Sequence, residues 1–221
     1  MTPNAFITFE GIEGCGKSTQ SALLKHALEA AGEATLSTRE PGGTALAERI
    51  RDLILSGAPG DMTAETELLL YLAARQDHVA HRIRPALAAG TWVVCDRFAD
   101  ATIAYQGHAR DLDLDQVTTW VNATRGLAPD LTLLLDLPVS EGLQRAHTRG
   151  EINRFEAEDP DFHQQVRDGY LALARAEPER IAVIDGSGAP EEVHERVIAA
   201  VNAHLKTRLA SPLSPAPSAS P

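Results

Sequence analysis

The residues with the clearest chemical use lie near the N-terminus, where spaced glycines precede a lysine and a serine. The run reads Gly11-Ile12-Glu13-Gly14-Cys15-Gly16-Lys17-Ser18 and is followed by Thr19. Glycines let the backbone curl so that successive N–H groups point inward at an anion. The Lys17 ammonium suits the β- and γ-phosphates of a nucleotide, and the Ser18 hydroxyl suits Mg²⁺. The spacing therefore predicts a phosphate-binding loop at the start of a helix.

Two arginine–acid pairs follow other strand-like runs. Arg39 and Glu40 precede Pro41 and two glycines, and Asp96 and Arg97 come directly after another apolar run. In open α/β sheets, ligands bind at the carboxyl ends of the strands, so these side chains are expected beside one crevice. The planar fork of arginine makes bidentate contacts with phosphate. Each pair alone could equally be a solvated turn, but two such pairs opposite a phosphate loop favour a binding site.

A third candidate group lies within a long helical pattern. Tyr71 and Arg75 are four residues apart, so they share one face of a helix. A flat ring and a donor fork on one face could stack on a base and bind its edge. Taken alone, the two residues could equally be a core tyrosine and a surface arginine.

These side chains need a framework that brings the strand ends together. Short apolar runs alternate with longer amphipathic stretches, which is typical of a parallel sheet with helices on both faces. The expected strands are Ala5–Phe9, Ala34–Ser37, Trp92–Cys95, Leu131–Leu135 and Ile181–Ile184. The expected helices are Lys17–Ala31, Thr44–Ser56, Thr63–Ala89, Leu114–Thr124, Ser140–Thr148, Asp161–Ala176 and Glu191–Leu209. The pattern predicts a three-layer α/β/α fold of the P-loop type, with a five-stranded parallel sheet and a short lid.

The composition fits one domain. The chain has 221 residues, of which 43% are hydrophobic and 23% are charged, enough for a full core without disulfides or structural metal. No shift in composition marks a second domain, so we expect a single domain over residues 1–209. Residues 210–221 are Ser, Pro and Ala apart from Leu213, which predicts a disordered tail.

Charge and hydropathy narrow the range of partners. The formal net charge of −11 argues against binding to nucleic acid or to an anionic membrane surface. Apolar runs such as Leu131–Leu137 are far shorter than the roughly 20 residues of a membrane helix, and no signal peptide is visible. Two cysteines, Cys15 and Cys95, form no disulfide framework. We therefore expect a cytoplasmic protein that binds small molecules.

Several motifs together resemble one known family. The phosphate loop is followed by Thr38-Arg39-Glu40-Pro41-Gly42-Gly43-Thr44, by Asp96-Arg97-Phe98 and by Ala104-Tyr105-Gln106-Gly107. This set is similar to that of bacterial thymidylate kinases, which are P-loop nucleoside monophosphate kinases, and the resemblance runs from about Phe6 to Ala203. It implies an ATP:dTMP phosphotransferase that uses ATP and Mg²⁺ to make dTDP for DNA synthesis, and it implies a homodimer.

The resemblance also implies roles around the acceptor phosphate. Arg97 would grip the 5′-phosphate of dTMP and carry charge during transfer, with Arg39 assisting nearby. Asp96 would help Ser18 to organise Mg²⁺, partly through water. Lys17 would complete the catalytic set on the ATP side.

For the base and sugar, the resemblance implies that Tyr71 stacks on thymine and that Arg75 reads its carbonyl. Tyr105 would crowd the 2′ position of the sugar and favour deoxyribose, and Glu13 would meet the sugar. The further dTMP-binding residues are Glu40, Pro41, Thr102 and Gln106. The pattern departs from the family at Ala101, where a serine is usual, which puts strict preference for thymine in doubt.

The lid is expected at about residues 145–156, which contain Arg145, Arg149 and Arg154 beside Gly150. Some family members carry a catalytic arginine in the phosphate loop, and others keep a glycine there and place arginines in the lid. Gly14 is consistent with the second arrangement. We expect Arg149 or Arg154 to reach the transferred phosphate and Arg145 to pack near adenine.

Other functions of a phosphate loop are less consistent with the sequence. No N-K-x-D motif is present and the only D-x-x-G, Asp185–Gly188, comes too late for a GTPase. The alternatives left open are another nucleotide kinase, a deoxynucleoside kinase with Glu40 as the general base, and a regulatory module that binds ATP without transfer.

Overall fold

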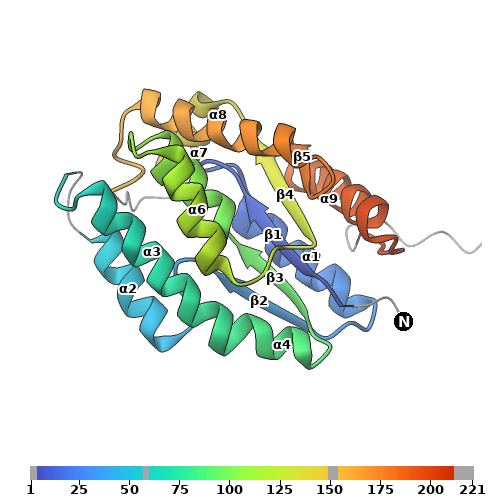
Figure 1. Ribbon diagram of the computed structural model, residues 1–221. Coiled ribbons are helices and arrows are strands. Elements are labelled where there is room, and N and C mark those ends of the chain that lie inside the picture. Colours follow the sequence, from blue (N-terminus) through green and yellow to red (C-terminus); the bar gives the residue numbers. More distant parts are fainter. Residues whose placement is uncertain (1–3, 57–59, 149–153, 212–221) are drawn as a thin grey trace, which may run out of the picture.

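A five-stranded parallel sheet in the order β2-β3-β1-β4-β5 forms the centre of the protein (Figure 1). The structure is a computed structural model that describes residues 4–56, 60–148 and 154–211. The strands are β1 (Phe6–Glu10), β2 (Thr35–Arg39), β3 (Trp92–Asp96), β4 (Leu131–Asp136) and β5 (Ile181–Asp185). The predicted strands are confirmed, and each begins within one residue and ends within two residues of the prediction.

Helices cover both faces of the sheet, which confirms the three-layer fold. They are α1 (Lys17–Ala30), α2 (Ala45–Leu55), α3 (Ala64–His78), α4 (Arg84–Ala88), α5 (Ala99–Thr102), α6 (Leu114–Arg125), α7 (Val139–His147), α8 (Pro160–Ala176) and α9 (Pro190–Leu205). Two π-helical segments, η1 (Val79–Ile83) and η2 (Ile103–His108), complete the described secondary structure. Within the described residues, no helix combines the length and the apolar character that a membrane span requires.

Alternate side chains of the central strand enter different layers, as the two-residue period of a strand requires. Ile7 and Phe9 share a buried cluster with Leu24 and Leu28 of α1, and α1 packs against α9 on that face. Phe6 enters a second buried cluster together with residues of α3 and α6. Figure 1 shows α3, α6 and α8 together on this second side.

The helix predicted over Thr63–Ala89 is interrupted, and the sequence contains the physical reason. The α-helix ends at His78 and continues as η1 before α4 begins. Pro85 has no N–H to donate to the carbonyl of His81, and its ring crowds that carbonyl. A wider π turn removes this conflict without breaking the helix axis.

The strand order places the candidate residues at one edge of the sheet. Asp96 at the end of β3 is level with Phe9 on β1 and with Arg39 on β2. From the central strand β1, the strands β3 and β2 lie toward one edge of the sheet, and β4 and β5 lie toward the other edge. Ligands of open α/β sheets bind at the carboxyl ends of strands where the order reverses in this way.

Candidate active site

The loop between β1 and α1 depends on glycines with left-handed backbone. Gly11, Gly14 and Gly16 have φ angles of 135°, 72° and 98°, a region that residues with side chains rarely adopt. A Cβ on Gly14 would also overlap the carbonyl oxygen of Gly142 in α7. An arginine therefore does not fit at this position of the loop without displacing α7.

Two polar side chains at the start of α1 connect the loop to the sheet. Lys17 Nζ donates to the carbonyl oxygens of Gly11 and Ile12 at 3.1 and 2.7 Å, which keeps the ammonium beside the loop. Ser18 Oγ donates to Asp96 Oδ2 at 2.7 Å. A hydroxyl and a carboxylate are the oxygen donors that Mg²⁺ prefers. The pair therefore fits a magnesium ion that takes its other ligands from nucleotide phosphates and water.

Arg97 is held at the mouth of the loop by several acceptors. Its backbone has a φ of 68°, which is uncommon for a residue with a side chain. Nη1 donates to Gly11 O and to Tyr170 Oη, both at 3.0 Å, and Nη2 donates to Glu13 Oε1 at 2.8 Å. The guanidinium also lies 4.9 Å from the centre of the Tyr105 ring. These contacts fix a positive charge beside the phosphate loop.

Two carboxyl groups beside Arg97 have pKa values shifted in opposite directions. Burial acts to raise the pKa of Glu13, but the Arg97 charge and neighbouring donors outweigh it and hold this pKa below its usual range. Burial, reinforced by the negative charge of Asp100, raises the pKa of Glu10 to about 7. The Tyr170 hydroxyl donates to Glu10 at 2.7 Å and opposes this shift only in part.

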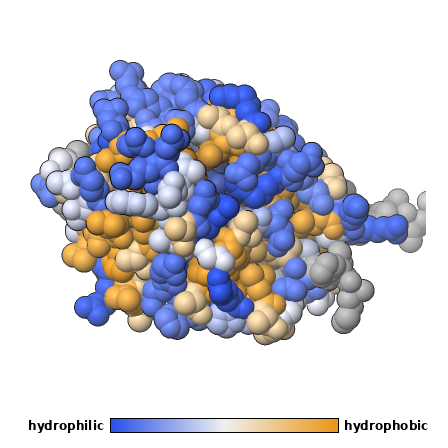
Figure 2. All heavy atoms as spheres, in the orientation of Figure 1, coloured by the Kyte–Doolittle hydropathy of each residue, from blue (hydrophilic) through white to orange (hydrophobic). Residues whose placement is uncertain are grey.

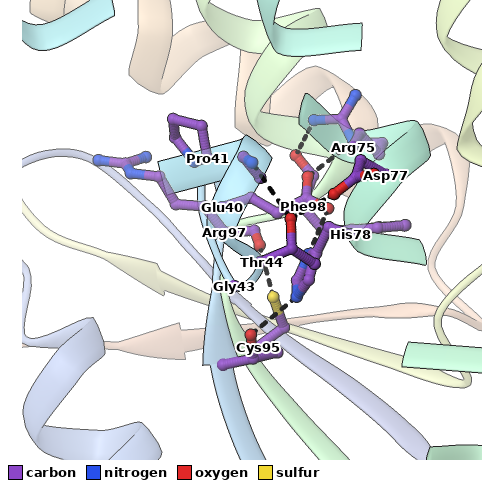
Figure 3. Close-up of polar contacts among 12 residues, drawn as sticks. Glu40, Pro41, Gly43, Thr44, Arg75, Asp77, His78, Cys95, Arg97 and Phe98 are labelled. Carbon is purple, nitrogen blue, oxygen red and sulfur yellow. Dashed lines mark hydrogen bonds and ion pairs between the residues drawn. The ribbon is translucent and has the colours of Figure 1, made fainter. Parts of the chain in front are cut away.

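The far end of the site is organised by Glu40 (Figure 3). Arg75 Nε donates to Glu40 Oε2 at 2.7 Å, and His78 Nδ1 donates to Glu40 Oε1 at 3.0 Å. Arg75 Nη2 donates to Phe98 O at 3.0 Å and to Thr102 Oγ1 at 2.8 Å. The Arg75 side chain is only 1% exposed, and a guanidinium so deeply buried needs this set of acceptors.

Two buried polar atoms near this network have no hydrogen-bond partner among the described residues. They are the donor Nη1 of Arg75 and the acceptor Oε1 of Gln106. The amide of Gln106 is oriented by its other atom, because Nε2 donates to Glu67 Oε1 at 2.7 Å. A ligand that offers one acceptor and one donor would satisfy both atoms.

A cleft of about 290 Å³ extends from the phosphate loop to Arg75 and Gln106. Its lining residues are Glu13, Gly14, Gly16, Lys17, Ser18, Thr19, Arg39, Glu40, Pro41, Arg51, Leu55, Tyr71, Arg75, Asp96, Arg97, Phe98, Ala101, Tyr105, Gln106, Phe155 and Glu156. The structure thus brings together nearly all residues predicted for dTMP. Thr102 is the exception, because it is buried and reaches the cleft only through Arg75.

A second hollow of about 340 Å³ lies on the other side of the loop. It is lined by Gly14, Cys15, Gly16, Thr19, Gln20, Arg145, Gly186, Gly188, Pro190 and Val193. Arg145 Nη1 donates to Gly186 O at 3.2 Å, so its guanidinium forms part of the wall. The two hollows share residues of the phosphate loop.

The predicted lid arginines have different positions. Arg149 and the neighbouring Gly150 lie outside the described residues. Arg154 is 4% exposed, and its Nη2 donates to Glu67 Oε2. Its guanidinium carbon lies 4.7 Å from the centre of the Phe155 ring. Arg154 lines neither hollow, so in this conformation it is a structural partner of α3.

Arg51, a cationic residue of the cleft, was not predicted because it belongs to no recognisable sequence motif. Arg51 in α2 donates to Pro41 O at 2.9 Å and lines the cleft. Burial lowers the pKa of its guanidinium. By contrast, the predicted Arg39 lines the same cleft with a side chain that is 54% exposed and donates to Glu48 at 2.9 Å.

Comparison with known proteins agrees with this geometry. The thymidylate kinase family model matches residues 9–197. The thymidylate kinase of Desulfovibrio desulfuricans is 50% identical over 211 residues, which cover 92% of this chain and 97% of that protein. That of Chromohalobacter salexigens is 53% identical over 214 residues, covering 96% and 99%.

A solved structure leads to the same result. The crystal structure of thymidylate kinase from Ehrlichia chaffeensis has a TM-score of 0.73 and 34% sequence identity, and the match covers 90% of this chain and 99% of that one. The phosphate loop, the cleft beside it and these relatives agree, and the chain belongs to the thymidylate kinase family.

Proposed function

We propose that this protein transfers the γ-phosphoryl group of ATP to the 5′-phosphate of dTMP and so forms dTDP. The pair of buried atoms without partners, Arg75 Nη1 and Gln106 Oε1, carries the proposal. Thymine offers a carbonyl acceptor at C4 beside an N–H donor at N3, which complements one donor and one acceptor. Cytosine offers a donor at C4 and an acceptor at N3, so it would leave both protein atoms unsatisfied.

The rest of the cleft supports a deoxyribonucleotide acceptor. Tyr71 lines the wall and would stack on the base. The Tyr105 ring, held under the Arg97 guanidinium, would occupy the space that a 2′-hydroxyl needs. Glu13 would meet the sugar, and Arg97 with Arg39 would bind the acceptor phosphate.

On the donor side, ATP would lie across the phosphate loop with its adenine beside Arg145. The backbone N–H groups of the loop and Lys17 would hold the β- and γ-phosphates. Magnesium, held by Ser18 and by Asp96 directly or through water, would neutralise phosphate charge.

The transfer itself needs little covalent help from the protein. The acceptor phosphate is already ionised, so no general base is required. Lys17 and Arg97 would hold donor and acceptor phosphates in line, and the buried surroundings strengthen their charges. The burial of Arg154 against Glu67 favours Arg149 as the arginine that reaches the transferred phosphate.

The alternative of a deoxynucleoside kinase is less consistent with the geometry. Such an enzyme would need Glu40 as a free base near a 5′-hydroxyl. Both oxygens of Glu40 instead accept hydrogen bonds, from Arg75 and His78. A regulatory module that only binds ATP would need the hollow beside Arg145 but would have no use for the separate cleft that contains Arg97.

We further propose one kinase domain over residues 1–209 with a tail over 210–221, working as a homodimer in the cytoplasm. Leu46, Leu53 and Leu69 on α2 and α3 are 48%, 58% and 55% exposed, and Figure 2 shows apolar surface over these helices. Clustered exposed leucines of this kind mark protein contacts. Sedimentation at micromolar concentration, with Leu53→Glu as the variant, tests the dimer.

An acceptor panel tests the proposed reaction. ADP formation would be followed with ATP, Mg²⁺ and each of dTMP, dUMP, dCMP, dGMP, AMP and thymidine. We expect rapid turnover with dTMP. Turnover of thymidine without turnover of dTMP would replace the proposal with a nucleoside kinase, and ATP binding without any turnover would favour the regulatory module.

A further inference from the structure

A buried carboxylate behind the cleft accepts hydrogen bonds from three side chains, which come from two separate parts of the chain. Glu67 in α3 is 1% exposed and lies one helical turn before Tyr71. Its Oε1 accepts from Gln106 Nε2 at 2.7 Å and from Arg110 Nε at 3.4 Å. Its Oε2 accepts from Arg110 Nη2 at 3.4 Å and from Arg154 Nη2. No motif or periodicity in the sequence connects these residues.

We propose that Glu67 is a positioning residue that determines base specificity by fixing the orientation of the Gln106 amide. This inference rests on the proposed function, in which Gln106 Oε1 accepts the N3–H of thymine. The oxygen and the NH₂ group of an amide exchange places by a half-turn, so glutamine alone could present either one to a base. A carboxylate offers acceptors only, and a turned amide would place oxygen against oxygen at Glu67.

The arginines around Glu67 stabilise the carboxylate that orients the Gln106 amide. Arg110 and Arg154 supply positive charge to a carboxylate that would be costly to bury alone. Arg110 also pairs with Glu158 at 2.7 Å and lies 4.6 Å from the centre of the Phe162 ring. Both oxygens of Glu67 thus accept hydrogen bonds, and Gln106 is held with its oxygen free of partners among the described residues.

Replacement of Glu67 by glutamine tests this role. Glu67→Gln leaves one acceptor oxygen for Arg110, Arg154 and Gln106 and adds a donor that suits the turned amide. The quantity to measure is the ratio of the inhibition constant of dCMP to the dissociation constant of dTMP. We expect this ratio to fall about tenfold, because rejection of cytosine depends on a fixed acceptor in the site. The ratio compares two ligands on the same folded protein, so partial unfolding does not change it.

A double-mutant cycle separates positioning from general structural support. Gln106→Leu removes the amide, so adding Glu67→Gln in that background is expected to leave the ratio unchanged. Arg180→Gln is the matched control, because it removes another largely buried ion pair, with Asp100 at 2.7 Å. It is expected to lower Tm without changing the ratio.

An unchanged ratio in Glu67→Gln, or an equal loss with and without Gln106, would overturn the inference. If the wild-type protein bound dCMP and dTMP with equal affinity, the result would instead contradict the proposed recognition of thymine by Arg75 and Gln106. The two failures are therefore distinguishable.

Discussion

Ser18 Oγ at the start of α1 donates to Asp96 Oδ2 at the end of β3, with 2.7 Å between the two oxygens. The two residues are far apart in sequence, and the parallel pairing of β1 with β3 brings them together. This contact ties the phosphate loop to the end of the strand that directly precedes Arg97. The phosphate loop and the end of β3 are therefore linked directly by side chains.

Asp96→Asn preserves the shape of the side chain but removes its charge, and we expect it to lower the affinity for Mg²⁺. Loss of a carboxylate in or next to the coordination shell costs about 10- to 100-fold in metal affinity. The Mg²⁺ concentration for half-maximal rate should therefore rise at least about tenfold. Rates measured over a magnesium series at saturating ATP and dTMP check this, and an unchanged midpoint would remove Asp96 from the metal site.

Arg97→Lys keeps the positive charge but loses the fork that donates to both Glu13 and Tyr170 and that we propose binds the acceptor phosphate. The kcat/KM for dTMP should fall by about 10² or more. ATP affinity, measured separately by calorimetry, should change little, because Arg97 faces the acceptor. A loss of less than about threefold would show that Arg97 does not bind the acceptor phosphate.

The two lid arginines should respond differently to alanine. Arg149→Ala is predicted to lower kcat by about 10³, as expected when a charge-stabilising arginine is removed from phosphoryl transfer. Arg154→Ala leaves Glu67 without one partner, so we expect a loss of unfolding free energy of about 3 kcal/mol and a smaller change in kcat. Single-turnover rates together with denaturant unfolding separate the two, and a reversal of the pattern would exchange the two roles.

The raised pKa of Glu10 predicts how stability depends on pH. The pKa is about 7 in the folded protein against an ordinary 4.5, so the native state binds the proton more tightly than the unfolded chain does. The contribution to stability is complete below about pH 4.5 and is lost as the pH rises to 7. Glu10→Gln has no charge to bury, so its stability relative to the wild type should improve between pH 5 and pH 8, by about 3 kcal/mol at most.

Urea unfolding of both proteins at the two pH values measures this difference. Comparison of the two proteins cancels groups that titrate equally in both. A stability difference that does not change with pH would contradict the assignment to Glu10.

The sheet and most of the helices were predictable from the sequence because these elements have strong local patterns. The apolar runs gave the strands to within two residues, and the long helix was wrong only where Pro85 forces the π turn of η1. The short α5 and η2 were not predicted, since Ala99 to His108 has neither a capping residue nor clear periodicity. Tertiary packing against α8 and α6 determines them.

Motifs predicted most of the residues that line the cleft, whereas contacts between residues far apart in the sequence were not predictable. Glu67 lies 39 residues from Gln106 and 87 residues from Arg154, and no spacing rule links such positions. Arg51 was missed for the same reason. The buried state of Arg154 also depends on Glu67, so its sequence neighbours alone suggested an exposed lid residue.

The central claim is transfer of phosphate from ATP to dTMP, and labelled ATP tests it most directly. Protein, Mg²⁺, γ-³²P-labelled ATP and dTMP would be mixed, and the products separated by chromatography. We predict that the label moves into dTDP in a one-to-one ratio with ADP formed, and that it does not move when dCMP replaces dTMP. Label released only as inorganic phosphate, or retained in ATP while ATP stays bound, would contradict the assignment of this chain as a dTMP-phosphorylating enzyme.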